Sequence, residues 1–246
     1  MIIADEGYYF GIGAFETIAV ENGTPLFLPQ HYERLLNTLE LLEISQTLSD
    51  IKKKVFSTLT DDTIRYGRKV LKIAVSEKNI ITYIRTNHYQ RKDYENGFIT
   101  SISNIRRNET SPLTYHKTLN YGDCIMEKRQ AQRAGIHEPV FLNTRGELAE
   151  GATTNIFFIK DKKIITPPLS CGMLPGIIRE YLLHTYEIRE QIVLPEDIIK
   201  YDEMFLTNSL LGIMPVRKIE NHMFHSMAFA AQLSRNFLSK FTFGTS

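Results

Sequence analysis

Two hydrophobic periods follow one another along the N-terminal part of the chain. Residues 14–28 combine alternating apolar positions with the pair Asn22-Gly23, a strong signal for a tight turn between two antiparallel strands. From residue 29 to residue 44, apolar side chains recur every three or four positions, which is the period of an amphipathic helix. A second helix over residues 49–59 and strands over residues 70–75, 80–85 and 98–103 complete an α+β arrangement with hairpin-linked, mostly antiparallel strands.

The remainder of the chain alternates short strands with helices. A helix over residues 123–134 ends at Gly135, a residue type that commonly terminates helices. Another helix begins in the segment Leu174-Pro175-Gly176-Ile177, and a closing helix covers residues 226–241. Strands are predicted over residues 139–142, 155–159, 163–165, 204–207 and 213–216.

The segment 105–114 marks the predicted domain boundary. It is polar, contains a proline and shows no hydrophobic period, as expected of a connection between domains. A chain of 246 residues is long enough for two cores. We therefore predict a small N-terminal α/β domain over residues 1–105, a linker over residues 106–114 and a C-terminal domain over residues 115–246, which contains most of the candidate residues considered next.

Composition and charge exclude several classes of partner. The 29 basic and 28 acidic residues leave a formal net charge of +1, so no strong field attracts nucleic acid or an anionic membrane. The N-terminus shows no basic segment followed by an apolar one, and no apolar run approaches about eighteen residues. We expect neither a signal peptide nor a transmembrane span. Cys124, Cys171 and the seven scattered histidines match no metal-ligand or disulfide spacing, so we expect no metal and a cytoplasmic protein.

The stretch 115–121 contains the strongest candidate for chemistry. Lys117 lies among apolar and aromatic residues, including Leu113 and Leu119, and burial lowers a lysine pKa toward the range of a free-amine nucleophile. Such an amine forms a Schiff base with an aldehyde cofactor, and pyridoxal 5'-phosphate (PLP) would then supply an electron sink. By composition alone, Lys117 would instead be one of many solvated lysines.

A PLP site also needs an acid at the pyridine nitrogen and a donor at the phenolic oxygen. Glu150 precedes a predicted strand, where its carboxylate could keep the ring nitrogen protonated; the alternative is an ordinary turn acid. Tyr121 follows Lys117 by four residues and could donate to the ring oxygen. A tyrosine beside an apolar run is also a common core residue.

The cofactor phosphate requires an anion site. The helix start at Pro175-Gly176-Ile177-Ile178 would aim backbone N–H groups at a phosphate, and Ser209 could add a hydroxyl. Arg34 is the cationic partner to consider, but the helical period places it opposite the apolar stripe of residues 32, 35, 36 and 39. Periodicity alone therefore predicts that Arg34 is solvated.

Taken in order, these motifs resemble the fold type IV PLP-dependent enzymes. That family comprises branched-chain aminotransferases, D-amino acid aminotransferases and 4-amino-4-deoxychorismate lyases. The matching segments run in the family's order from residue 7 to about residue 217. They are residues 10–17, 31–35, 117–121, 150–155, 174–177 and 205–209.

The resemblance implies a small N-terminal α/β domain and a larger, barrel-like C-terminal α/β domain with PLP between them, usually in a homodimer. It implies that Lys117 is the Schiff-base lysine, that Glu150 faces the pyridine nitrogen and that Tyr121 lies near the ring oxygen. The resemblance overrides the solvated position that the helical period assigns to Arg34. The implied phosphate ligands are Arg34, Ile177, Ile178 and Ser209.

Three departures from the family pattern bear on the site. Ile12 stands where the family usually has Asp, and Ile178 replaces a common Thr, so a backbone contact with phosphate is expected at Ile178. Phe15 stands where D-amino acid aminotransferases carry a tyrosine that helps to hold the substrate, which argues against that activity.

The segment 205–216 and the short chain look most like 4-amino-4-deoxychorismate lyase. We therefore expect a lyase that forms 4-aminobenzoate and pyruvate, a step toward folate, with Lys117 as general base. One alternative is an aminotransferase for branched-chain or other small amino acids that uses the same lysine and acid. Another is a non-catalytic binding protein with a degenerate site. The ligands of the substrate carboxylates stay open among the available cations Arg85, Arg106, Arg107 and His88.

Overall fold

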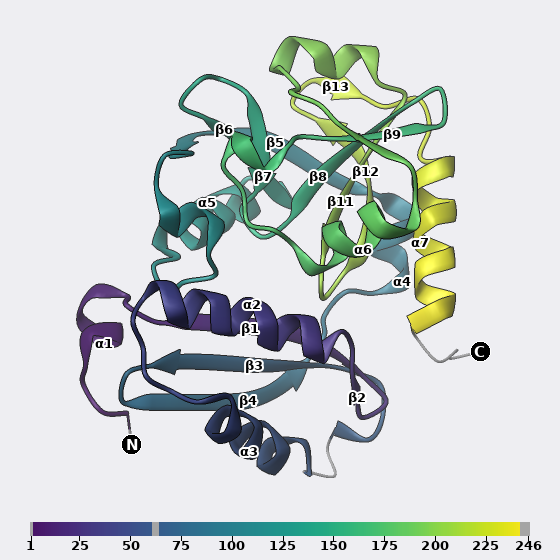
Figure 1. Ribbon diagram of the computed structural model, residues 1–246. Coiled ribbons are helices and arrows are strands. Elements are labelled where there is room, and N and C mark those ends of the chain that lie inside the picture. The colour runs from purple at the N-terminus through teal and green to yellow at the C-terminus, as the bar shows by residue number, and fades with distance from the viewer. Residues whose placement is uncertain (1, 61–63, 242–246) are drawn as a thin grey trace. The chain divides into compact units, whose positions relative to one another are not determined.

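The computed structural model describes residues 2–60 and 64–241, which fall into two compact units. The smaller unit is built from the described residues of Met1–His88, His116–Tyr121 and Phe241–Ser246. The larger unit is built from Tyr89–Tyr115 and Gly122–Lys240. Both units combine helices with strands, so the two-domain α+β fold class is confirmed (Figure 1).

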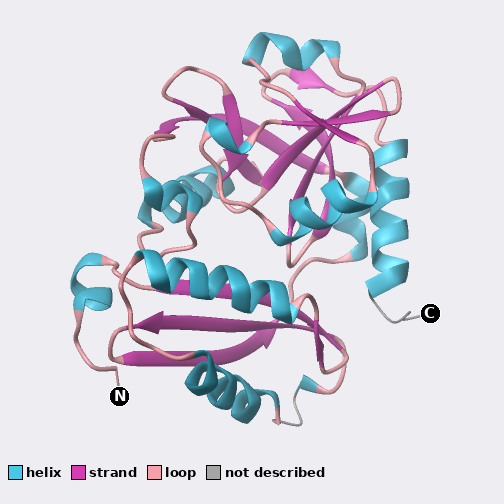
Figure 2. Ribbon diagram, viewed as in Figure 1, coloured by secondary structure: helices cyan, strands magenta, loops and turns pink. Residues whose placement is uncertain are grey.

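The smaller unit is an antiparallel sheet with helices. Its strand order is β2-β1-β3-β4, and the strands pair with their neighbours in antiparallel register. Helix α2 lies along β1 (Figure 2). The elements are α1 (Glu6–Phe10), β1 (Ala14–Glu21), β2 (Thr24–Pro25), α2 (Leu28–Leu41), α3 (Leu48–Leu59), β3 (Arg68–Ser76) and β4 (Asn79–Thr86).

Alternation along the strands of the smaller unit separates two faces of its sheet. The buried cluster contains alternate residues of β1 and β3, such as Ile18, Leu71 and Ile73, packed with Leu35 of α2 and Ile51 of α3. Successive strand side chains point to opposite faces. Phe15 and Thr17 of β1 and Lys72 of β3, which alternate with these residues, therefore lie on the other face. The predicted hairpin and the two predicted helices are confirmed.

The larger unit contains the remaining elements. They are α4 (Arg91–Asn96), β5 (Phe98–Arg107), η2 (Pro112–Tyr115), α5 (Gly122–Arg133), β6 (Glu138–Asn143), β7 (Leu148–Gly151), β8 (Asn155–Lys160), β9 (Lys163–Thr166), η3 (Leu169–Cys171), α6 (Ile177–Thr185), β10 (Ile188–Glu190), η4 (Pro195–Lys200), β11 (Glu203–Asn208), β12 (Gly212–Ile219), β13 (His222–Met223) and α7 (Ala228–Phe241).

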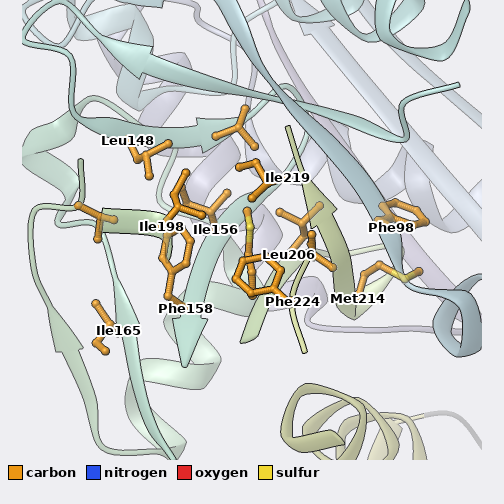
Figure 3. Packing of buried hydrophobic residues seen from close by; sticks show 14 of the residues in the cluster. Phe98, Leu148, Ile156, Phe158, Ile165, Ile198, Leu206, Met214, Ile219 and Phe224 are labelled. Atoms are coloured by element: carbon orange, nitrogen blue, oxygen red, sulfur yellow. The ribbon is translucent and has the colours of Figure 1, made fainter. Parts of the chain in front are cut away.

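The sheet of the larger unit closes on itself. Its order is β10-β9-β8-β11-β12-β5-β6-β7, and β7 pairs a second time with β8. The strands from β8 round to β7 therefore form a barrel, as the family resemblance implies. A buried apolar cluster packs between the strands, with Ile156, Phe158, Leu206 and Met214 among its members (Figure 3).

The division into units differs from the predicted domain boundaries in two places. Strand β5 pairs in parallel with β12 and β6, so residues 89–105 belong to the larger unit. The expectation of mostly antiparallel strands up to residue 103 is wrong for this strand. The segment His116–Tyr121, predicted in the C-terminal domain, belongs to the smaller unit. The physical reason is the same in both cases, because backbone pairing with distant strands decides the membership.

The hydrophobic period of the sequence did not predict several short helices and strands. Helices α1 and α4 and strands β7, β10 and β13 each span too few residues to show a hydrophobic period. Within residues 2–60 and 64–241, no helix has the length and apolar character needed to cross a membrane.

Candidate active site

Lys117 is held against strand β1 by the backbone on either side of it. The Phe15 N–H donates to the Lys117 carbonyl at 2.9 Å, and the Leu119 N–H donates to the Gly13 carbonyl at 2.7 Å. A β-carbon at Gly13 would lie 2.6 Å from a methyl of Leu119 and 2.7 Å from the Val75 carbonyl oxygen. Only glycine allows this approach, so Gly13 fixes the position of the lysine segment.

Two lysine amines gather at the ring of Phe15. The Lys117 Nζ lies 4.5 Å from the centroid of that ring and 5.2 Å from the centroid of the Tyr121 ring. The two rings meet edge to face, with their centroids 5.1 Å apart. The second amine is Lys72 of β3, whose Nζ lies 3.4 Å from the Phe15 centroid and 3.1 Å from the Thr17 hydroxyl oxygen.

Lys72 carries the most strongly perturbed amine of this cluster for which a shift is resolved. Burial, and then the neighbouring charge of Lys117, lower its pKa to about 7, against the opposing effect of Glu16. Sequence reasoning missed this residue. The available signal was a lysine inside the predicted strand 70–75. In that strand, residues 71, 73 and 75 are all apolar, whereas Lys72 lies on the alternate face with Val70 and Ala74. Lys72 and Thr17 are opposite one another in the register of β3 and β1, which no local pattern reports.

Arg34 is bound to a buried carboxylate. Its Nε and Nη2 donate to the two oxygens of Glu16, each at 2.8 Å, and Nδ1 of His31 lies 2.6 Å from the second oxygen. The Arg34 side chain is 11% exposed, so the periodic prediction of a solvated arginine is wrong. The buried face of α2 includes His31 and Thr38 as well as the apolar stripe, and Arg34 lies in line with these polar residues.

The neighbouring charges keep the buried Glu16 carboxylate ionised. Burial opposes ionisation of Glu16, but Arg34 and His31 outweigh it and hold the pKa of Glu16 well below its usual range. Burial lowers the pKa of His31 against the attraction of Glu16. The Glu16 carboxylate therefore stays ionised and fixes the orientation of the Arg34 guanidinium.

In the larger unit, Glu150 is buried at the end of β7 and its carboxylate is held on both oxygens. Arg107 Nε donates to Oε1 at 2.8 Å, and Arg107 Nη2 pairs with the same oxygen. The Leu174 N–H donates to Oε2 at 3.1 Å. Arg107 thereby neutralises a charge that would be costly alone in the interior.

The turn that follows Glu150 rests on a second buried carboxylate. Glu138 accepts from the Thr153 N–H at 2.6 Å and from the Thr154 hydroxyl at 3.1 Å, and it pairs with Lys128. The Asn208 side chain donates to the Thr153 carbonyl at 3.1 Å. This network fixes the turn between β7 and β8, and sequence reasoning did not single out Glu138.

Ile177 and Ile178 form the first turn of α6. Gly176 caps the helix without any side-chain hydrogen bond, so the first backbone N–H groups lack intrahelical partners. A β-carbon at Gly176 would lie 2.0 Å from the Asn155 side-chain oxygen, which explains the glycine. Both isoleucine side chains are buried, leaving the backbone to present donors at this helix end.

Ser209 lies in the turn between β11 and β12. The Asn208 side-chain oxygen accepts from the N–H groups of Leu210 and Leu211, each at 2.9 Å, and this fixes the turn around Ser209. Of the four cations considered for substrate carboxylates, Arg107 is paired with Glu150 as described. Arg106 donates to the Ser103 carbonyl at 2.9 Å. Arg85 and His88 are exposed.

These residues fit the chemical demands of PLP within each unit. The smaller unit offers an amine beside aromatic rings and a guanidinium, and the larger unit offers a buried carboxylate and an uncapped helix start. The larger unit also holds a buried hydroxyl oxygen, that of Thr207, with no partner among the described residues. Thr207 lies on β11, which packs against α6, and a phosphate would give its hydroxyl a partner.

Comparison with known proteins gives consistent matches. The family model described as amino-transferase class IV matches residues 13–219. The aminodeoxychorismate lyase of Bacillus subtilis is 28% identical over 96% of this chain and 87% of its own length. A protein of Thermotoga maritima, named a probable branched-chain-amino-acid aminotransferase, is 28% identical over 85% of this chain and 78% of its own.

The fold comparison agrees with the sequence comparison. A crystal structure of a Legionella pneumophila protein, provisionally named 4-amino-4-deoxychorismate lyase, superposes with a TM-score of 0.81 at 27% identity. The match covers 96% of this chain and 94% of that one.

Proposed function

Because the chain belongs to the class IV aminotransferase family, whose members depend on PLP, we propose that it is a 4-amino-4-deoxychorismate lyase. The reaction forms 4-aminobenzoate and pyruvate on the route to folate. The likeness to the Bacillus subtilis lyase across nearly the whole chain supports this proposal.

The observation that carries the proposal is the second amine at Phe15. The lyase substrate bears one carboxylate on its ring and another on its enolpyruvyl group, in addition to the reacting amine. Lys72 lies beside Lys117 on the same ring and would bind one of these carboxylates. A bound anion raises a lysine pKa, so substrate would return Lys72 to its charged form. Leucine brings a single carboxylate, whereas the lyase substrate brings two.

The proposed roles in the reaction follow from the positions of the side chains. PLP, when bound, supplies the electron sink for the pair left by loss of a proton. Lys117 would hold the cofactor through its aldehyde, and the substrate amine would displace it; the freed Nζ would then remove the proton on the amine-bearing carbon as general base. Loss of the enolpyruvyl oxygen then makes the ring aromatic, and Lys117 returns a proton as pyruvate forms. Phe15 and Tyr121 keep water away from the amine.

The proposed cofactor contacts are those that the family resemblance implies. Glu150, oriented by Arg107, faces the pyridine nitrogen, and Tyr121 donates to the ring oxygen. The phosphate is held by the N–H groups that open α6 and by a guanidinium and a hydroxyl. These phosphate ligands are Arg34, Ile177, Ile178 and Ser209. The family resemblance further leads us to propose a homodimer, which sedimentation of the purified protein would test.

A paired substrate assay tests the proposal. The purified protein, loaded with PLP, is incubated with aminodeoxychorismate, and 4-aminobenzoate and pyruvate are measured separately. Equal amounts of both products are expected, and Lys117→Ala should abolish both while Lys53→Ala, at an exposed lysine of α3, should not. A protein that makes neither product would refute the lyase assignment.

The second candidate is an aminotransferase for branched-chain amino acids. The observation in its favour is the Thermotoga maritima relative, which is as similar in sequence as the lyase. Incubation with leucine and 2-oxoglutarate distinguishes the two activities, because only the aminotransferase forms 4-methyl-2-oxopentanoate. Rapid formation of this keto acid without 4-aminobenzoate would establish the second candidate.

A further inference from the structure

Thr207 on β11 carries a buried hydroxyl that the protein itself leaves unsatisfied. The residue is 1% exposed, and its Oγ1 has no hydrogen-bond partner in the described part of the chain. A buried hydroxyl without a partner destabilises the folded protein. Another buried threonine of this sheet, Thr166, does not share the defect, since its Oγ1 donates to the Ile156 carbonyl at 2.8 Å.

The strand register places Thr207 on the face that holds the start of α6. Thr207 and Asn155 are opposite one another in the antiparallel pair β11 and β8, so their side chains share one face of the sheet. The Asn155 side chain donates to the Leu174 carbonyl at 2.9 Å and lies against Gly176. Helix α6 packs beside β11 (Figure 1).

The other neighbours on this face are apolar. Phe157 and Phe205 follow the same alternation, and their rings stack with centroids 4.8 Å apart. They offer no acceptor to the Thr207 hydroxyl. The nearby helix start presents backbone N–H groups, because Gly176 provides no side-chain cap. Such N–H groups at the start of a helix favour an anion.

We infer that the Thr207 hydroxyl donates a hydrogen bond to the phosphate of the cofactor at the N-terminus of α6. This inference rests on the proposed use of that helix by PLP and adds to it a ligand that the family resemblance does not supply. The buried hydroxyl is unsatisfied in the protein alone and becomes satisfied when the phosphate binds.

The test compares PLP with pyridoxal, which has the same aldehyde and ring but no phosphate. The full-length protein is stripped of cofactor, and both compounds are titrated into wild type, Thr207→Val and Thr207→Ser. Loss of a hydrogen bond to a charged group should weaken PLP binding to Thr207→Val about tenfold or more. Pyridoxal binding should be unchanged, and Thr207→Ser should retain most of the PLP affinity.

Thr166→Val is the matched control. It removes a satisfied hydrogen bond, so it should lower the thermal midpoint of the cofactor-free protein and leave the ratio of PLP to pyridoxal affinity unchanged. Thr207→Val should not lower that midpoint, because no hydrogen bond is lost. An unchanged affinity ratio in Thr207→Val, or a midpoint that falls as far as in Thr166→Val, overturns the inference. A protein that binds PLP in this way but makes no 4-aminobenzoate would refute the proposed reaction alone.

Discussion

Replacement of Lys72 by Met gives the sharpest test of the amine cluster. The side chain is half-buried on β3, on the ring of Phe15 and beside the charge of Lys117. Both features disfavour the charged amine in the folded protein. Methionine retains much of the length and volume of lysine and removes the charge, so Lys72→Met should be more stable than wild type near neutral pH.

The pH dependence of stability follows from the two pKa values. The folded protein releases the Lys72 proton near pH 7, whereas the unfolded chain keeps it up to the ordinary value of 10.5. Between these values the unfolded state binds more protons, so the free energy of unfolding rises with pH. The unfolded state binds about half a proton more than the folded state at pH 7 and nearly one proton more at pH 9. Each bound proton changes the free energy of unfolding by about 1.4 kcal/mol per pH unit, so this free energy rises by about 2 kcal/mol from pH 7 to pH 9.

Urea unfolding at pH 7, 8 and 9 measures this rise. Wild type should gain about 2 kcal/mol more than Lys72→Met across the interval, because the difference between them isolates one proton. Lys54→Met, at an exposed position of α3, controls for the loss of a positive charge and should follow wild type. Parallel curves for wild type and Lys72→Met would show that the amine is not buried beside Lys117 in the way described.

Other predictions concern two ion pairs, Glu16 with Arg34 and Glu150 with Arg107, and Asp5, whose side chain caps the start of α1. Glu16→Gln should destabilise the protein by about 3 kcal/mol in urea unfolding at pH 7, because it strips the Arg34 guanidinium of its carboxylate; a loss under about 1 kcal/mol would contradict the pairing. Arg107→Met should cost a similar amount by leaving the Glu150 charge uncompensated, and Arg107→Lys should recover part of it. Burial opposes ionisation of Asp5, but hydrogen bonds from Ser76 and its neighbours lower its pKa to about 2. Asp5→Asn should therefore be less stable than wild type at pH 6, and thermal melts of the two should converge as the pH falls from about 4 toward 2.

Much of the local structure could be read from the chain because it depends on near neighbours. The Asn22-Gly23 pair takes positive φ values of 47° and 84°, as a tight hairpin turn requires. The apolar stripe predicted for residues 29–44 packs α2 into the hydrophobic core of the smaller unit. Lys117 was a candidate from its apolar surroundings, and the family resemblance led to the proposal that it is the cofactor lysine.

The remaining features depend on pairing between distant segments. Arg34 was misplaced by its helical period because the partner that buries it, Glu16, lies on a strand 18 residues earlier. Strand β5 was assigned to the wrong unit because its partners β12 and β6 come later in the chain. A period describes one segment at a time and carries no information on which strand a residue will face.

The sequence by itself determined the α+β class, the positions of the longer helices and strands, and the ordered motifs that indicate a PLP enzyme. Only the tertiary structure decided that the Lys117 segment joins the smaller unit, that Lys72 shares the ring of Phe15, and that Arg107 holds Glu150. Lys72 meets Thr17 across 55 residues, and Arg107 meets Glu150 across 43. Contacts of that span arise from strand register and barrel closure, which are settled by the burial of the whole core rather than by any local pattern.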